Sequence, residues 1–197
     1  MPNRFAWEGV CALLAAGSLL GWWLPSNLLD WQPGAAPSEP WRFVTAAWVH
    51  WSALHLTANL AGVAVVAALG RVARLPLAAG LAWLLAWPLT QAGLLMQPAL
   101  AHYGGASGVL HAGVAVAACW LMAAQRGPAR GIGVAIAGGL LIKVLVEAPW
   151  LGPLAHPRGW DIALAPLAHA SGALAGLGCA AVALMLKRRH RQSLHGS

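Results

Sequence analysis

Long apolar runs, separated by short polar or basic segments, make up most of the chain. About 20 apolar residues in a helix cross the hydrocarbon core of a bilayer, so the pattern predicts membrane-spanning helices. We expect an all-α, polytopic bundle of six spans that makes up a single domain over residues 1–197. The expected spans are residues 6–24, 53–69, 75–95, 107–124, 131–146 and 166–186, with an outer loop at 25–51 and a basic tail at 187–197.

Local signals agree with several of these boundaries. Ser52 is a suitable N-cap for the second span, and Pro166 is a suitable first-turn residue for the sixth. Pro88 predicts a kink in the third span. The first run could be a signal peptide, but it has no small-residue cleavage site followed by a soluble mature domain, so we take it as a span.

Composition excludes an ordinary water-soluble domain. The chain is 59% apolar and 9% charged, whereas soluble domains average about 45–50% apolar and about 25% charged. Cys11, Cys119 and Cys179 lie inside apolar runs without CxxC spacing, which predicts small buried side chains and no disulfide framework. The net charge of +7 does not indicate nucleic-acid binding, because the cations lie between apolar runs.

The cations also predict an orientation. Membrane proteins keep Lys and Arg in their cytoplasmic loops, and with six spans both termini share one side. Only Arg42 and Arg158 fall in outer loops, and Lys143 falls within the fifth span. The other cations, all on the expected cytoplasmic side, are Arg4, Arg71, Arg74, Arg126, Arg130, Lys187, Arg188, Arg189 and Arg191.

The outer loop is rich in tryptophan, whose amphipathic ring favours the boundary between lipid and water. We therefore expect the loop's tryptophans at that boundary: Trp31, Trp41, Trp48 and Trp51.

Polar residues inside the membrane are costly and commonly functional. The second, fourth and sixth spans run in the same direction, so their first turns share one depth near the outer face. These turns carry His55 and Asn59, then Ser107, then His169, with His50 just before the second span. We therefore expect these side chains to form one site.

Ser107 follows a glycine-rich segment that contains Gly104 and Gly105, and it starts a helix. Free N–H groups at a helix start can stabilise an oxyanion, but Ser is also a common helix cap. His169 could be the general base that a serine nucleophile needs, or a packing histidine bonded to a carbonyl.

The other polar groups have simpler interpretations. His55 and Asn59 are four residues apart and are either a buried hydrogen-bonded pair or donors to an oxyanion. His50 is expected to tie the outer loop to the bundle. Lys143 and Glu147 have i,i+4 spacing, which favours a structural ion pair over a proton relay. No chemistry is assigned to the remaining histidines, His102, His156, His190 and His195.

Four linked motifs resemble the rhomboid intramembrane serine proteases. They are Trp41-Arg42, His50-x4-His55-x3-Asn59, Gly105-x-Ser107-Gly108 and His169-x2-Gly172-x3-Gly176, and together they extend over the chain from Trp41 to Leu186. The resemblance implies a Ser107/His169 dyad without a catalytic carboxylate, and an oxyanion hole formed by the Ser107 N–H, His55 and Asn59. Gly172 and Gly176 would let the sixth span press His169 against the fourth.

One departure concerns the residue four positions after the serine. Many rhomboids carry an aromatic there, often Tyr, whereas this chain has His111. Three roles stay open for His111: stacking on His169, hydrogen bonding to His169, or being the base itself, in that order of preference. Gly108 and Gly113 also line the fourth span, which we expect to favour close packing against the sixth.

The start of the fourth span and the small core are similar to the rhombosortase branch. That resemblance implies a serine endopeptidase in the bacterial inner membrane, with its site near the periplasmic face and without a cofactor. Its partners would be membrane-anchored proteins that end in Gly-Gly, a hydrophobic helix and a basic tail, and no nucleic acid. Water, or an amine of another molecule, would then cleave the acyl-enzyme. The alternative function is a general rhomboid protease that cleaves other single-span substrates.

Two other classes of protein are weaker interpretations. A metalloprotein could use His50, His55, His111 and His169, but the chain has no HExxH motif, and we expect no intramembrane carboxylate near those histidines. A small transporter could use Lys143 and Glu147, but no inverted repeat is evident.

Overall fold

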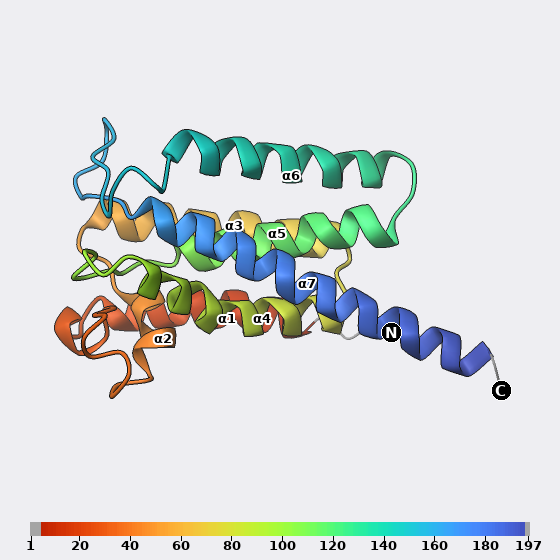
Figure 1. Ribbon diagram of the computed structural model, residues 1–197, viewed down its shortest axis with the longest axis horizontal. Coiled ribbons are helices and arrows are strands. Elements are labelled where there is room, and N and C mark those ends of the chain that lie inside the picture. Colours follow the sequence, from red (N-terminus) through yellow and green to blue (C-terminus); the bar gives the residue numbers. More distant parts are fainter. Residues whose placement is uncertain (1–4, 196–197) are drawn as a thin grey trace.

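The computed structural model describes residues 5–195, which form helices and connecting loops without a β-strand (Figure 1). Short 3-10 helices lie at Ser26–Leu28, Ala46–Trp48 and Gly93–Met96. The α-helices in this range are α1 (Phe5–Gly21), α2 (Arg42–Thr45), α3 (Ala53–Val72), α4 (Leu77–Ala92), α5 (Ser107–Ala124), α6 (Pro128–Glu147) and α7 (Pro166–His195).

Five helical segments are long and apolar enough to cross a membrane: α3, α4 with the 3-10 turn that continues it, α5, α6 and α7. Helix α1 is also apolar but has only 17 residues. The all-helical class is therefore confirmed, and the long apolar helices agree with the prediction of a multi-pass membrane protein.

Helix boundaries differ from the sequence prediction at several ends. Helix α5 has the predicted bounds, and the Ser52 hydroxyl caps α3 by accepting the His55 N–H at 3.0 Å. Helix α6 is longer than predicted because Pro128, whose fixed φ suits a first turn, starts it three residues earlier. Helix α7 continues through the basic tail to His195, since Lys and Arg are good helix formers.

Helix α5 is the centre of the bundle, and α6 is its outermost member. In α5, 61% of the apolar window is buried, compared with 6% in α6. Figure 1 shows α6 lying along the outside of the α3 and α5 layer. A mainly apolar helix that so little protein buries is suited to a lipid environment.

Helices α5 and α7 approach each other closely through small residues. A Cβ on Gly172 would overlap the Gly108 carbonyl, and one on Gly176 would overlap the backbone of Ala112. The predicted role of these glycines in helix packing agrees with this contact. The prediction for Gly113 is wrong, because Gly113 faces the Trp83 ring of α4 instead of α7.

Tryptophans fill the space among α1, α3, α4 and α5. Trp7 and Trp83 contact each other with ring centroids 4.5 Å apart. Each ring N–H reaches a backbone carbonyl: Trp7 donates to Val66 at 3.0 Å, and Trp83 donates to Val109 at 2.8 Å. These bonds allow large indole rings to be buried without an unpaired donor.

The loop end of the bundle is organised by Arg42. Its buried guanidinium donates to the Asp30 carbonyl at 2.6 Å and to the Asp30 carboxylate at 3.1 Å, and it also pairs with Glu39. The other Asp30 oxygen contacts His102 Nδ1 at 2.6 Å. The loop that contains these residues is therefore fixed by charge-assisted hydrogen bonds.

Only part of the tryptophan prediction for this loop agrees with the structure. Trp41 and Trp51 are exposed, as a boundary position requires. Trp31 is fully buried, packed edge-on against Phe43, so its predicted boundary position is wrong. The local reason is that Trp31 exchanges two backbone hydrogen bonds with Tyr103, which holds it under the loop.

The cations gather at the opposite end of the bundle, where α3 ends, α5 joins α6, and α7 extends outward (Figure 1). Arg4 lies outside the described residues. Among the cysteines, all three are free thiols and Cys11 is buried as predicted, whereas Cys119 and Cys179 are only half-buried.

Adding one methyl group to Gly176 should destabilise the protein, because the new Cβ has no room against α5. Overpacking of this kind costs about 1–3 kcal/mol. Gly178→Ala is the matched control on the same helix, since a Cβ there meets nothing within 4 Å. Thermal unfolding in detergent should show a lower midpoint for Gly176→Ala and an equal or higher one for Gly178→Ala. Equal midpoints for both variants would contradict the close α5–α7 contact.

Candidate active site

Ser107 is the first residue of α5, and the loop before it is held in place from both sides. Tyr103 exchanges backbone hydrogen bonds with Trp31 at 2.7 and 3.0 Å, and the Gly105 N–H donates to the Ala46 carbonyl at 2.9 Å. The position of the Ser107 side chain is therefore set by the outer loop as well as by its own helix.

Gly105 is needed at its position for two reasons. Its φ is +123°, which residues with a side chain rarely adopt. A Cβ there would also lie 2.5 Å from Nε2 of His55. The glycine therefore brings the imidazole of α3 close to the start of α5.

The Ser107 hydroxyl and the His169 ring contact each other directly. Nε2 of His169 lies 2.9 Å from Oγ of Ser107, across 62 residues of sequence. The N-cap of α5 is Ala106 and the Ser107 hydroxyl contacts His169, so the capping alternative is not the role seen here. The His169 side chain is buried, 7% exposed, and comes from the first turn of α7.

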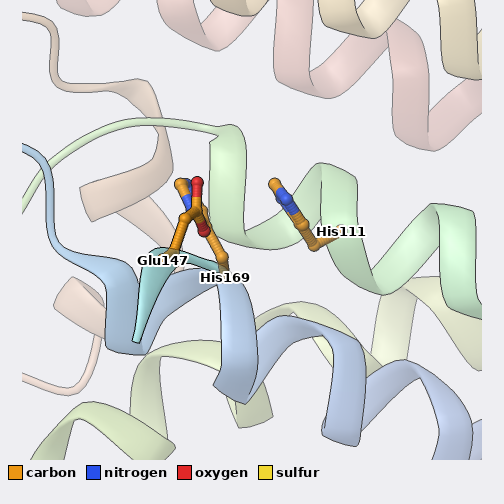
Figure 2. Close-up of side chains that lie close together, drawn as sticks. All are labelled: His111, Glu147 and His169. Atoms are coloured by element: carbon orange, nitrogen blue, oxygen red, sulfur yellow. The ribbon is translucent and has the colours of Figure 1, made fainter. Parts of the chain in front are cut away.

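A carboxylate approaches the other ring nitrogen of His169. Oε2 of Glu147, the last residue of α6, lies 2.6 Å from Nδ1 of His169 (Figure 2). The expectation that no intramembrane carboxylate lies near the histidines is therefore wrong. Glu147 is the site residue that sequence analysis missed. The sequence feature that could have indicated it is an acidic residue at the outer end of a span, 22 residues before His169.

Glu147 also pairs with Lys143 one helical turn earlier, through its other oxygen, Oε1. The predicted i,i+4 ion pair therefore exists, but it is only half of the environment of this carboxylate. Each oxygen of Glu147 has a different cationic or polar partner.

His111 lies flat against His169. The two ring centroids are 4.2 Å apart and the ring planes differ by 13°. Nδ1 of His111 faces the Ser107 carbonyl oxygen at 2.7 Å, which fixes the ring on the turn below Ser107. Of the three roles that the sequence leaves open for His111, this geometry agrees with stacking on His169. Figure 2 shows His111 on α5 facing the ring of His169 on α7.

His55 and Asn59 are both buried beside Ser107, but their side chains do not pair. The Asn59 amide donates to the backbone carbonyl of His55 at 3.0 Å. This bond leaves the second amide N–H of Asn59 without an intramolecular partner in the described part of the chain, and Nδ1 of His55 is likewise unpaired there. The Asn59 amide therefore has one N–H left to donate at the level of Ser107, and the His55 nitrogen on the side of Gly105 is Nε2.

The contacts of His50 agree with the expectation that it ties the outer loop to the bundle. Nδ1 of His50 contacts the Trp48 carbonyl at 3.2 Å, and the ring packs against His55 with centroids 4.7 Å apart. Burial lowers the pKa of His50 to about 4, so the ring is neutral at pH 7 and adds no charge beside His55.

Two polar residues of the loops complete the surroundings. Asp161 accepts a hydrogen bond from the Ser52 hydroxyl at 2.8 Å, which joins the α6–α7 loop to the start of α3. His156 lies in the same loop and lines the cavity described next. Neither contact follows from spacing along the sequence.

A cavity of about 890 Å³ opens at these side chains and extends along α3, α5 and α6. The residues of the site that line it are His55, Asn59, Ser107, His111, Glu147 and His169. Beyond them the walls are mainly apolar, with Gly62, Val66, Leu110, Val114 and Leu140. Ligand sites are commonly of this size and have this mixture of apolar walls and a few convergent polar groups.

The side chains of His111, Glu147 and His169 are close enough to suggest a metal site, with ligand atoms within 4.8 Å of one another. A metal held by two histidines lies in the plane of both rings. Here the two rings are stacked face to face, so their nitrogen lone pairs do not converge. A metal would require at least one ring to turn. The four-histidine set considered from the sequence is divided into two pairs, His50 with His55 and His111 with His169.

Comparison with protein-family models and with curated proteins finds no match to this chain. The function must therefore be argued from the residues that the fold brings together. Those are a serine and a histidine in direct contact, a carboxylate behind the histidine, and a cavity in front of the serine.

Proposed function

We propose that this protein is an intramembrane serine endopeptidase with Ser107 as nucleophile and His169 as general base. The observation that carries the proposal is the 2.9 Å contact between Oγ of Ser107 and Nε2 of His169 at the mouth of a cavity. A serine hydroxyl is a weak nucleophile until a neighbouring base accepts its proton. The resemblance of the four sequence motifs to rhomboid proteases supports the same roles.

The reaction is acyl transfer. His169 accepts the Ser107 proton while Oγ forms a bond to the scissile carbonyl carbon, and the carbonyl oxygen becomes an oxyanion. The imidazolium then gives its proton to the leaving amine as the C–N bond breaks. Water, or an amine other than the leaving one, attacks the resulting ester and releases Ser107.

The oxyanion would be held by three donors: the backbone N–H of Ser107, His55 and Asn59. The N–H of Ser107 has no intrahelical partner because it lies in the first turn of α5. Donors fixed in advance in a water-poor site stabilise a developing charge strongly, and loss of one typically slows turnover by about 10²- to 10³-fold.

The proposed topology has six spans, with α1 included, and both termini in the cytoplasm. The clustering of cations at one end of the bundle supports this orientation, since Lys and Arg concentrate on the cytoplasmic side. The site would then lie near the outer, periplasmic face of a bacterial inner membrane.

The proposed substrates are proteins with a C-terminal Gly-Gly, a hydrophobic helix and a basic end. Such an anchor places its basic end in the cytoplasm and its Gly-Gly near the outer face, at the level of Ser107. The apolar walls of the cavity suit a hydrophobic segment. Glycine reduces the cost of unwinding a helix to expose the scissile amide.

Labelling with a serine-directed fluorophosphonate tests the proposed chemistry. The unmodified protein should be labelled, Ser107→Ala should not, and His169→Ala should lose nearly all reactivity. Substrate turnover in either variant should fall on the order of 10⁶-fold, because nucleophile and base act as a unit.

Ser171→Ala is the matched control, since this buried α7 serine bonds to the Thr90 carbonyl instead of to a histidine; it should be labelled normally. A chelator should have no effect. Labelling that persists in Ser107→Ala, or that a chelator abolishes, would contradict a serine mechanism and favour a metal site.

Replacing His111 tests the stacking role. His111→Tyr should retain activity, because Tyr presents a flat ring to His169, whereas His111→Ala should lose up to about tenfold, since an aromatic pair contributes roughly 0.5–1.5 kcal/mol. The measurement is the cleavage rate of a common substrate. An inactive His111→Tyr together with an active His169→Ala would instead make His111 the base.

The substrate class is tested by co-expression with a protein that ends in Gly-Gly, a hydrophobic helix and Lys or Arg. We expect release of that protein from its anchor, measured by its transfer from the membrane to the soluble fraction. Changing Gly-Gly to Leu-Leu should suppress release because Leu favours an unbroken helix. Equal release of both would favour a general rhomboid-like protease.

A further inference from the structure

We propose that Glu147 is a positioning residue for His169, so that three side chains, and not two, form the hydrolytic site. The inference rests on the proposed function, and it departs from the carboxylate-free dyad that the rhomboid resemblance implies. Glu147 lines the cavity but makes no hydrogen bond to Ser107; it acts through the His169 ring.

The two ring nitrogens of His169 have different partners. Nδ1 faces Oε2 of Glu147 at 2.6 Å, and Nε2 faces Oγ of Ser107 at 2.9 Å. An ionised carboxylate can only accept hydrogen bonds, so Nδ1 must carry the ring proton. Nε2 then presents its lone pair to the Ser107 hydroxyl, which is the tautomer that a general base needs.

The surroundings of Glu147 favour an ionised carboxylate in this role. Lys143 binds Oε1, which leaves Oε2 free to accept from His169. A lipid-facing ion pair would need only the lysine. Instead the glutamate side chain is 21% exposed and directed at a ring that is 7% exposed. Charged groups in apolar surroundings require partners, and the second partner here is the proposed base.

Two contacts would then hold the His169 ring, one at its edge and one on its face. Glu147 fixes its edge through Nδ1, and His111 covers its face at 4.2 Å (Figure 2). During acyl transfer the Ser107 proton moves to Nε2, the Nδ1 proton stays on the ring, and the positive charge of the imidazolium lies beside the Glu147 carboxylate. The carboxylate itself remains unprotonated throughout.

The kinetic test uses Glu147→Gln, which keeps the size of the side chain but removes its charge and lets an amide N–H face Nδ1. We expect kcat to fall on the order of 10²- to 10⁴-fold, as when an amide replaces the carboxylate of a triad, with KM unchanged. Glu147→Asp keeps the charge but withdraws it by one methylene, and it should retain more activity than Glu147→Gln.

Glu8→Gln is the matched control, because Glu8 also forms an ion pair, with Arg71 at 3.2 Å, but on a different helix. It should leave kcat and KM unchanged. Thermal unfolding of all three variants shows whether each is folded. A folded Glu147→Gln with the kcat of the unmodified protein would overturn the proposal.

A second measurement does not depend on activity. Protonated and unprotonated ring nitrogens differ widely in ¹⁵N chemical shift, so NMR of ¹⁵N-histidine protein reports the tautomer, with His169→Ala identifying the His169 signals. We expect Nδ1–H in the unmodified protein and a mixture of tautomers in Glu147→Gln. An Nε2–H tautomer in the unmodified protein would overturn the proposal.

The two hypotheses fail separately. If fluorophosphonate does not react with Ser107 in the unmodified protein, the proposed protease function is wrong, whereas the tautomer of His169 still tests whether Glu147 fixes the ring. If Ser107 is labelled but Glu147→Gln changes neither rate nor tautomer, only the positioning role is wrong.

Discussion

The close contact between α5 and α7 is the constraint on which the site depends. Glycines at 108, 172 and 176 let the two helix backbones touch, since a Cβ on either α7 glycine would overlap the backbone of α5. Only at this separation can the short side chain of Ser107 reach the ring of His169. The backbone contact therefore fixes a side-chain geometry, and small residues contribute to the site without taking part in its chemistry.

Loops and helices hold the two walls of the site in different ways. The loop end of the bundle is rigid because Arg42 connects Asp30, Glu39 and the carbonyl of Asn27. Through the paired backbones of Trp31 and Tyr103, this loop fixes the glycine segment before Ser107. Helix α6, by contrast, is buried by little protein yet supplies Glu147. The site therefore combines one firmly fixed wall with one that is mostly surrounded by lipid.

Much of the site could be predicted because three helices that run in the same direction share the depth of their first turns. That reasoning brought together His55, Asn59, Ser107 and His169, and the structure does place all four on one cavity. It could not find Glu147, since α6 runs the opposite way and contributes its last turn. The exact ends of α6 and α7, and hence which side chains meet across the loop between them, do not follow from hydrophobic patterning.

Other errors have similarly local causes. Gly108 and Gly113 were assigned to one face, but five residues turn an α-helix by about 140° beyond a full circle, so they face different neighbours. The boundary position predicted for Trp31 is wrong because nothing in its sequence neighbourhood shows that it pairs with Tyr103, 72 positions later. Apolar patterning predicts which segments are helices far better than it predicts how the loops between them fold.

The directions of the helices around His169 have an electrostatic consequence. Helix α5 begins at Ser107, whereas α6 ends at Glu147, so peptide dipoles of opposite sense meet at the site. A helix start carries about half a positive elementary charge and a helix end about half a negative one. In the proposed reaction the oxyanion forms at the start of α5, and the imidazolium forms beside the end of α6. His169 itself lies in the first turn of α7, whose positive start opposes an imidazolium, so the negative end of α6 and the Glu147 carboxylate would offset the effect of that start.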